Sequence, residues 1–175
     1  MAAALLLAGT LSAMGTAQDG AISEYQVKAA YLYNFAKFVE WPAKSFTSAS
    51  APYRICILGK DPFREALQSL TRGKQVKGRG FEILGDVTDP AQAARCHILF
   101  VSTSGNKQFQ RMLPALQGRS ILIVGESEGF ARQGGMINFV LEGDRVLFEV
   151  NQRAAEQAGL KISAKLLSVA KEVTV

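Results

Sequence analysis

The chain has 175 residues, of which 48% are hydrophobic and 20% are charged, and its formal net charge is +5. This composition is typical of an ordinary globular domain and excludes an intrinsically disordered protein. The lysines and arginines are scattered along the sequence, which argues against nucleic-acid binding, and no apolar stretch is long enough to insert across a membrane.

The first 17 residues are expected to be a signal peptide. They contain a short apolar run, Ala2 to Ala8, followed by small residues that place a cleavage site after Ala17. The basic residues that usually begin such a leader are missing, because nothing before Asp19 is charged, and an ordinary apolar helix is the alternative. Residues 18–175 are then a single exported domain, expected in the bacterial periplasm.

A long helix is expected from Ala21 to Glu40, because large apolar side chains recur there at helical spacing and a proline follows. The helix is unusually aromatic. Its rings could all pack on the core, or some of them could contact a second protein. Both are satisfied if Tyr31 and Phe38 point inward while Tyr33 and Trp41 point outward.

Strands and helices then alternate. The continuous apolar run 97–102 indicates a strand covered on both faces, as in a parallel sheet. The alternation predicts an α/β fold, a three-layer sandwich with a mixed, mostly parallel central sheet flanked by helices. The expected strands are 53–58, 81–84, 97–102 and 120–124, and the expected helices are 63–70, 89–94 and 107–116.

The last part of the chain changes pattern. Strands are expected at 136–141 and 145–150, on either side of the hairpin signal Glu142-Gly143-Asp144, so that a C-terminal antiparallel hairpin completes the sheet. A short helix at 152–158 follows. Ser163 then caps a last helix, whose apolar face consists of Leu166, Leu167, Val169 and Ala170.

The two cysteines, Cys56 and Cys96, lie forty residues apart in strand-like runs. If these strands are neighbours, a disulfide is expected in an oxidising compartment. Closing a loop of this length would contribute about 4 kcal/mol in the chain-entropy model. Two buried free thiols are the alternative.

Catalytic and metal-binding patterns are weak. Gly125 to Gly129 matches the G-x-S-x-G pattern of serine hydrolases, with Ser127 at its centre, but the single histidine, His97, precedes it instead of following it. His97 heads an apolar strand and is expected to be structural. With one histidine and two distant cysteines, there is no close pair of metal ligands. We therefore expect no enzymatic activity, no metal and no cofactor.

Several ordered blocks together resemble the YfiR-like family of periplasmic proteins. These blocks extend over nearly the whole of residues 18–175. They are the helix KAAYLYNFAKF at 28–38 followed by Trp41-Pro42, ICILG at 55–59, CHILFVS at 96–102, GGMINF at 134–139, FEVN at 148–151 and AGLKISAKLL at 158–167.

The resemblance implies a function and partners. The best-understood members of this family bind the periplasmic sensor domain of an inner-membrane diguanylate cyclase and hold that enzyme inactive. An OmpA-like outer-membrane lipoprotein can remove the repressor, after which cyclic di-GMP rises and biofilm forms. The resemblance also implies a homodimer and a bridge between Cys56 and Cys96. A second cysteine pair that some members carry near Gly134 is missing here.

Our main interpretation is therefore a non-catalytic periplasmic repressor of such a cyclase. The alternative is a small-ligand-binding sensor module that feeds another membrane receptor, such as a histidine kinase, and a deep pocket near Met136 and Glu149 would favour it. The partner surface is expected on the first helix and the C-terminal part of the chain, at Tyr33, Trp41, Met136, Glu149 and Ile162.

Overall fold

The computed structural model describes residues 17–175, with side chains from residue 24 onward. Apart from Ala17, the predicted leader lies outside the described residues. Within the described range, no helix combines the length and the hydrophobicity needed to cross a bilayer.

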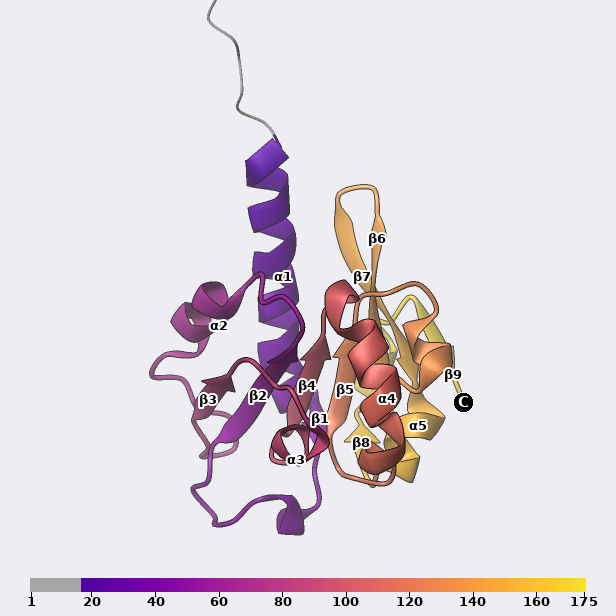
Figure 1. Ribbon diagram of the computed structural model, residues 1–175. Helices are drawn as coiled ribbons and strands as arrows, with labels where there is room; N and C mark the ends of the chain where they lie inside the picture. The colour runs from indigo at the N-terminus through magenta and orange to yellow at the C-terminus, as the bar shows by residue number, and fades with distance from the viewer. Residues whose placement is uncertain (1–16) are drawn as a thin grey trace, which may run out of the picture.

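Seven strands form the central sheet: β2 (Tyr53–Leu58), β3 (Phe81–Leu84), β4 (Ile98–Val101), β5 (Leu122–Gly125), β6 (Ile137–Glu142), β7 (Arg145–Asn151) and β9 (Glu172–Thr174). Their order across the sheet is β3-β2-β4-β5-β6-β7-β9 (Figure 1). The strands from β3 to β6 pair in parallel, β7 pairs antiparallel with β6, and β9 pairs in parallel with β7. All residues of β4 and β5 are buried, as expected for strands that are covered on both faces.

Helices cover both faces of this sheet (Figure 1). They are α1 (Ala17–Phe38), α2 (Arg64–Thr71), α3 (Pro90–Ala93), α4 (Asn106–Leu116), α5 (Gln152–Gln157) and α6 (Ala164–Leu167). In the strand order, β3 lies on one side of β2, and β4 and β5 lie on the other side. The connection from β2 to β3 therefore runs across the sheet in one direction, and the connections from β3 to β4 and from β4 to β5 run in the opposite direction. Right-handed connections therefore place α2 on the face opposite to α3 and α4, and α1 packs against α2. This arrangement confirms the predicted fold class.

A second, two-stranded sheet joins the two ends of the domain. In it, β1 (Val39–Glu40) pairs antiparallel with β8 (Lys161–Ile162), so the end of α1 is tied to the C-terminal segment. Three short 3-10 helices complete the structure: η1 (Ala43–Ser45), η2 (Thr103–Gly105) and η3 (Phe130–Gln133). Strands of two residues have no recognisable alternation, so the sequence did not predict β1 and β8.

The aromatic side chains of α1 pack mainly on the sheet. Phe35 is fully buried, and its ring centroid lies 6.0 Å from that of Phe139 on β6 and 5.6 Å from that of Phe148 on β7. The ring of Tyr31 also contacts Phe148, at 5.3 Å. Burial of one such side chain stabilises the fold by about 1.5–3 kcal/mol. At these positions the aromatic content of α1 therefore seats the helix on the sheet.

The predicted continuation of the last helix through Val169 and Ala170 is wrong. Helix α6 ends at Leu167, and Val169 is 62% exposed. The cause is the next strand, because the backbone N–H of Lys171 donates to the carbonyl of Phe148 at 2.8 Å and draws the chain alongside β7 as β9. Strand β9 consists of only three residues, two of them charged or polar, and has no alternating pattern from which the sequence could predict a strand.

A disulfide joins Cys56 in β2 to Cys96, which lies just before β4, with the two Cα atoms 5.9 Å apart. The parallel pairing of β2 with β4 brings the two residues together. Both cysteines of the chain are thus used in a cross-link between β2 and the segment that leads into β4, and the alternative of two free thiols does not apply.

Candidate functional site

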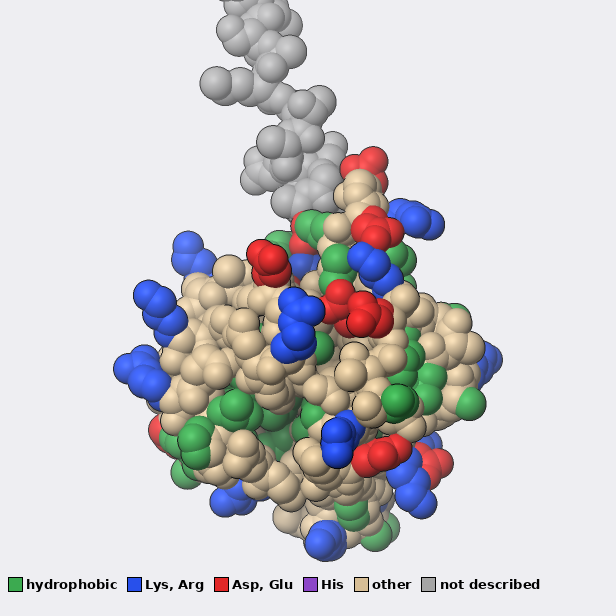
Figure 2. Space-filling model, turned by 90° about the vertical axis from the view of Figure 1, so that its right-hand side faces the viewer, with side chains coloured by type: hydrophobic (Ala, Val, Ile, Leu, Met, Phe, Trp, Pro, Cys, Tyr) green, Lys and Arg blue, Asp and Glu red, His purple; other side chains and the backbone are tan. Residues whose placement is uncertain are grey.

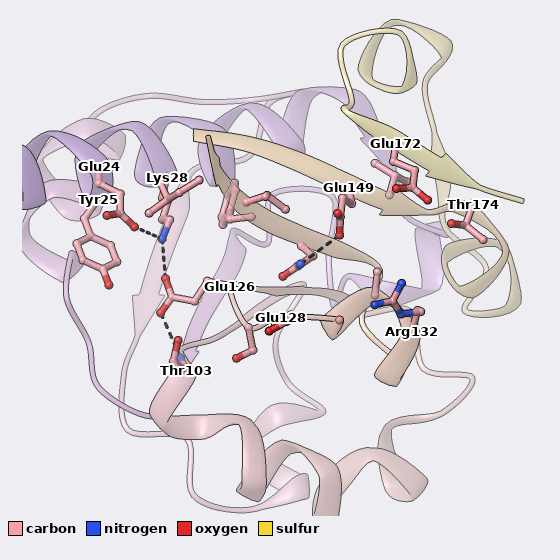
Figure 3. A pocket seen from close by; sticks show the side chains of 18 residues that line it. Glu24, Tyr25, Lys28, Thr103, Glu126, Glu128, Arg132, Glu149, Glu172 and Thr174 are labelled. Carbon is pink, nitrogen blue, oxygen red and sulfur yellow. Dashed lines mark hydrogen bonds and ion pairs between the residues drawn. The ribbon is translucent and has the colours of Figure 1, made fainter. Parts of the chain in front are cut away.

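A cavity of about 570 Å³ lies beside the carboxyl ends of β4 and β5 (Figure 3). Its walls come from α1, the loop after β5, η3 and the strands β6, β7 and β9. In doubly wound sheets, loops at the carboxyl ends of parallel strands form the usual binding crevice, so this position is the first candidate for a functional site.

A buried ion triad closes one end of the cavity. The ammonium of Lys28 on α1 donates to Glu126 Oε2 at 2.7 Å and also to Glu24, one helical turn earlier. The side chains of Lys28 and Glu126 are only 4% and 7% exposed. The other oxygen of Glu126 accepts the backbone N–H of Thr103 at 3.2 Å (Figure 3). The triad therefore links α1 to the loops after β4 and β5.

The position of Lys28 explains why it needs these partners. It lies one turn before Tyr31 and Leu32, on the side of α1 that faces the sheet, where an unpaired charge would be costly. Burial alone would lower the pKa of Lys28, but the hydrogen bonds to Glu126 and Glu24 outweigh it and raise that pKa above its ordinary value. Lys28 therefore stays charged at neutral pH.

Two buried polar atoms on the cavity wall have no hydrogen-bond partner among the described residues: Ser127 Oγ and Asn138 Oδ1. Asn138, on β6, is 3% exposed, and its Nδ2 donates to Glu149 Oε2 on β7 at 3.2 Å. Because a carboxylate accepts only, this bond fixes the orientation of the amide and leaves the carbonyl oxygen free. Buried polar atoms are normally paired, so such an atom needs an explanation.

The predicted partner residues do not form one surface. Glu149 lines the cavity, whereas Met136 is 5% exposed and belongs to the core, where it offers little surface to a partner. Tyr33, Trp41 and Ile162 are half-buried and lie at the other end of α1, with Ile162 brought close by the pairing of β8 with β1.

Tyr33 and Trp41 belong to what we call the aromatic row, which consists of Tyr33, Phe81, Tyr53 and Trp41. Consecutive ring centroids in this row are 5.3, 5.6 and 5.5 Å apart. The indole N–H of Trp41 also donates to the carbonyl of His97 at 3.2 Å. These contacts give Trp41 a role inside the fold, and its role in partner binding stays a prediction.

Comparison with known families identifies the chain. The sequence profile of the YfiR/HmsC-like family matches residues 25–171, which is nearly the whole domain from α1 to the residue before β9. The chain belongs to the YfiR/HmsC-like family. This is a family of periplasmic, non-catalytic regulators of diguanylate cyclase signalling that act on membrane-associated partners.

Among solved structures, this YfiR/HmsC-like chain is similar to the ABC domain in complex with L-Trp from Streptococcus pneumonia, with a TM-score of 0.52 and 11% sequence identity. The match covers 86% of this chain and 60% of that chain, so the chain spans about three fifths of the structure it matches. At this identity the likeness shows the fold alone.

The histidine of the chain lies far from the serine of the G-x-S-x-G motif. Ser127 lies in the loop after β5, whereas His97 lies before β4. Since β4 and β5 are parallel, the two side chains are at opposite edges of the sheet. Among residues 24–175, no group of three or more histidines, cysteines or carboxylates is placed to hold a metal ion.

His97 has the structural role predicted for it. Its ring is 5% exposed and stacks on Phe46, with centroids 4.3 Å apart. Nδ1 accepts the backbone N–H of Arg54 at 2.9 Å, so Nε2 carries the proton and donates to the carbonyl of Ser45 at 3.0 Å. The neutral ring thereby holds η1 against the start of β4. Burial lowers the pKa of His97, and nearby Arg54 and Arg79 lower it further against the opposing effect of the Ser45 bond.

This environment predicts that the fold loses stability in mild acid. The unfolded histidine binds a proton near pH 6.5, whereas the folded one binds it only at lower pH. The full stability is therefore present above about pH 6.5 and declines below it, by at most about 1.4 kcal/mol per pH unit. Urea unfolding between about pH 7.5 and about pH 5.5 measures this slope. The non-titrating variant His97→Gln should flatten it, and equal slopes for both proteins would contradict the assignment.

The sequence reasoning missed Lys28, Glu24, Glu126 and Asn138 as residues of one site. Two signals were present: Asn138 interrupts the apolar run of β6, and Lys28 interrupts the apolar face of α1. A polar residue at a position that the pattern predicts to be buried requires a hydrogen-bond or charge partner. For this physical reason such a residue is a candidate for a functional site.

Proposed function

We propose that this protein binds the periplasmic sensor domain of an inner-membrane diguanylate cyclase and holds the enzyme inactive, which limits cyclic di-GMP and biofilm formation. Membership of the YfiR/HmsC-like family over residues 25–171 carries this proposal. A regulator of this kind works by binding the inactive state of its target more tightly than the active state. In the same proposal the protein is a homodimer in the periplasm, and an OmpA-like outer-membrane lipoprotein relieves the inhibition by competing for it.

The aromatic row is the surface at which we propose that the cyclase binds. Tyr33, Phe81 and Trp41 are half-buried, so each leaves part of its ring at the surface. The exposed lysines Lys37 and Lys74 lie over the ring of Tyr33, with their ammonium groups 4.3 and 5.1 Å from its centroid. Aromatic side chains bordered by charges are typical of the energetic centre of protein interfaces. A complementary partner would present acidic groups around an apolar centre.

The test is the cellular level of cyclic di-GMP in a strain that lacks this gene. Deletion should raise it, and the exported protein should lower it again, whereas a copy without residues 1–17 should not. The double variant Lys37→Glu/Lys74→Glu reverses the charge beside the aromatic row and should fail to restore repression.

The matched control is Lys107→Glu/Arg111→Glu, which makes the same change of charge at exposed positions of α4. This control should repress like the unmodified protein. If deletion leaves cyclic di-GMP unchanged, the proposed cyclase repression is wrong. If both double variants repress equally well, the aromatic row is not the contact surface.

A specific observation also favours the second candidate function, a small-ligand sensor module coupled to another membrane receptor such as a histidine kinase. A deep pocket near Met136 and Glu149 would favour this candidate, and Glu149 lines the cavity, whereas Met136 does not. Two further lining residues, Ser127 and Asn138, each have a buried polar atom without a partner. Ligand binding and partner binding are compatible, because the cavity and the aromatic row involve different ends of α1.

A further inference from the structure

We infer that the cavity beside β5 and β6 binds a small organic amine, whose cationic nitrogen donates to Asn138 and to the carboxylates around it. The inference rests on the second function proposed above, in which the cavity is a ligand site. It does not depend on which membrane protein is the partner.

The unpaired carbonyl of Asn138 indicates a ligand that donates hydrogen bonds. Asn138 lines the cavity and is only 3% exposed. Its amide nitrogen donates to Glu149, and its carbonyl oxygen is buried without a donor. A buried acceptor left unpaired is destabilising, and a ligand N–H would satisfy it. The hydroxyl of Ser127, in the same lining, is also unpaired and can accept a further N–H.

The charge of the lining indicates that this donor is a cation. Five carboxylates line the cavity against two basic groups, Lys28 and Arg132. The charge of Lys28 is already offset by Glu24 and Glu126. The carboxylates that remain are Glu128, Glu149 and Glu172, which exceed the single charge of Arg132. Figure 2 shows acidic side chains on this side of the molecule, below the tip of the β6–β7 hairpin, with Lys and Arg side chains beside them. An anion would meet net repulsion there, whereas an ammonium group would be attracted.

The remaining lining indicates an organic body attached to this ammonium. Val140 and Leu141 on β6 and Val150 on β7 contribute apolar surface to the same cavity. Ligand sites of this kind combine an apolar wall, which contributes affinity, with a few placed polar groups that orient the ligand. An amine with an apolar group of moderate size matches both parts of the lining.

The fold also explains why the cavity opens here. The crevice expected from the strand order lies between β2 and β4, where the chain changes direction across the sheet. That crevice is filled: a Cβ atom at Gly105 would lie 2.3 Å from the carbonyl oxygen of Leu58, and the stacked rings of Tyr25 and Phe63 join α1 to the loop after β2. At β6 the sheet changes from parallel to antiparallel pairing, because β6 pairs in parallel with β5 and antiparallel with β7. The cavity lies at this change.

The experiment compares three probes of similar size that differ in charge: phenethylamine, phenethyl alcohol and phenylacetate. Isothermal titration calorimetry with the purified mature chain should detect saturable binding of the amine and much weaker binding of the alcohol and the anion. The variants Asn138→Leu and Glu128→Gln should each weaken amine binding, by about tenfold for the loss of the buried carbonyl. Glu128 is exposed, so its variant should fold normally.

Glu65→Gln is the matched control, since Glu65 is an exposed glutamate on α2, away from the cavity. It should bind the amine like the unmodified protein. If the alcohol or the anion binds at least as well as the amine, or if Asn138→Leu and Glu128→Gln bind it unchanged, the amine assignment is wrong while a ligand site can still exist. If none of the three probes binds, the amine assignment is overturned, whereas the proposed cyclase repression is tested separately by the cyclic di-GMP measurement.

Discussion

Replacing Lys28 by methionine is expected to lower the free energy of unfolding by about 3–5 kcal/mol, because the change leaves the buried carboxylate of Glu126 without its counter-charge. Lys28 and Glu126 are 4% and 7% exposed, so water compensates only in small part for the lost ammonium. The hydrophobic stem of lysine is retained by methionine, and the loss therefore reports the charge and not the packing. Urea unfolding of the two purified proteins at neutral pH measures the difference.

The control for this prediction is the double variant Lys28→Met/Glu126→Gln. Glutamine removes the unpaired charge and keeps an oxygen that can accept the backbone N–H of Thr103, so most of the lost stability should return. Lys37→Met, at an exposed position of the same helix, should change stability little. If the single and the double variant are equally unstable, the burial of an unpaired charge is not the cause.

Removing the disulfide is expected to destabilise the protein by about 4 kcal/mol in the variant Cys56→Ala/Cys96→Ala. The cross-link closes a loop with a sequence separation of 40 that contains α2, β3 and α3. Without it, the unfolded chain gains conformational freedom that folding must then remove. Both sulfur atoms lie in the core, with Cys56 fully buried and Cys96 4% exposed, so alanine introduces no buried polar group.

Reduction provides an independent check on this second prediction. A reductant should shift the unfolding midpoint of the unmodified protein towards that of the double variant and should leave the double variant unchanged. If the oxidised protein and the double variant are equally stable, the disulfide does not stabilise the fold by restricting the conformations of the unfolded chain, and the prediction is wrong.

Helix α1 connects the two surfaces that the proposals use. Its first half contributes Glu24 and Lys28 to the cavity at the carboxyl ends of β4 and β5, and its second half contributes Tyr33 to the aromatic row. The row continues to Trp41, which bonds to His97 before the start of β4. Variants at one surface can therefore be measured for their effect on the other.

Much of the fold follows from local features of the sequence. The continuous apolar run at β4 predicts a strand covered on both faces, and the hairpin signal at residues 142–144 predicts the β6–β7 pair. Ser163 caps its helix as predicted, because its hydroxyl accepts the backbone N–H of Leu166 in the first turn. These signals depend on spacing within a few residues, and a single sequence contains that information.

The candidate site depended on contacts between distant segments. Lys28 and Glu126 are 98 residues apart, and their pairing requires α1 to lie across the carboxyl ends of β4 and β5. Asn138 has an unpaired carbonyl only because β7 places Glu149 beside its amide nitrogen. Strands β1, β8 and β9 likewise exist through their partners rather than through a pattern of their own. Local sequence sets which residues are polar or apolar, but burial and pairing are properties of the assembled layers, and these decide which of the polar residues form a site.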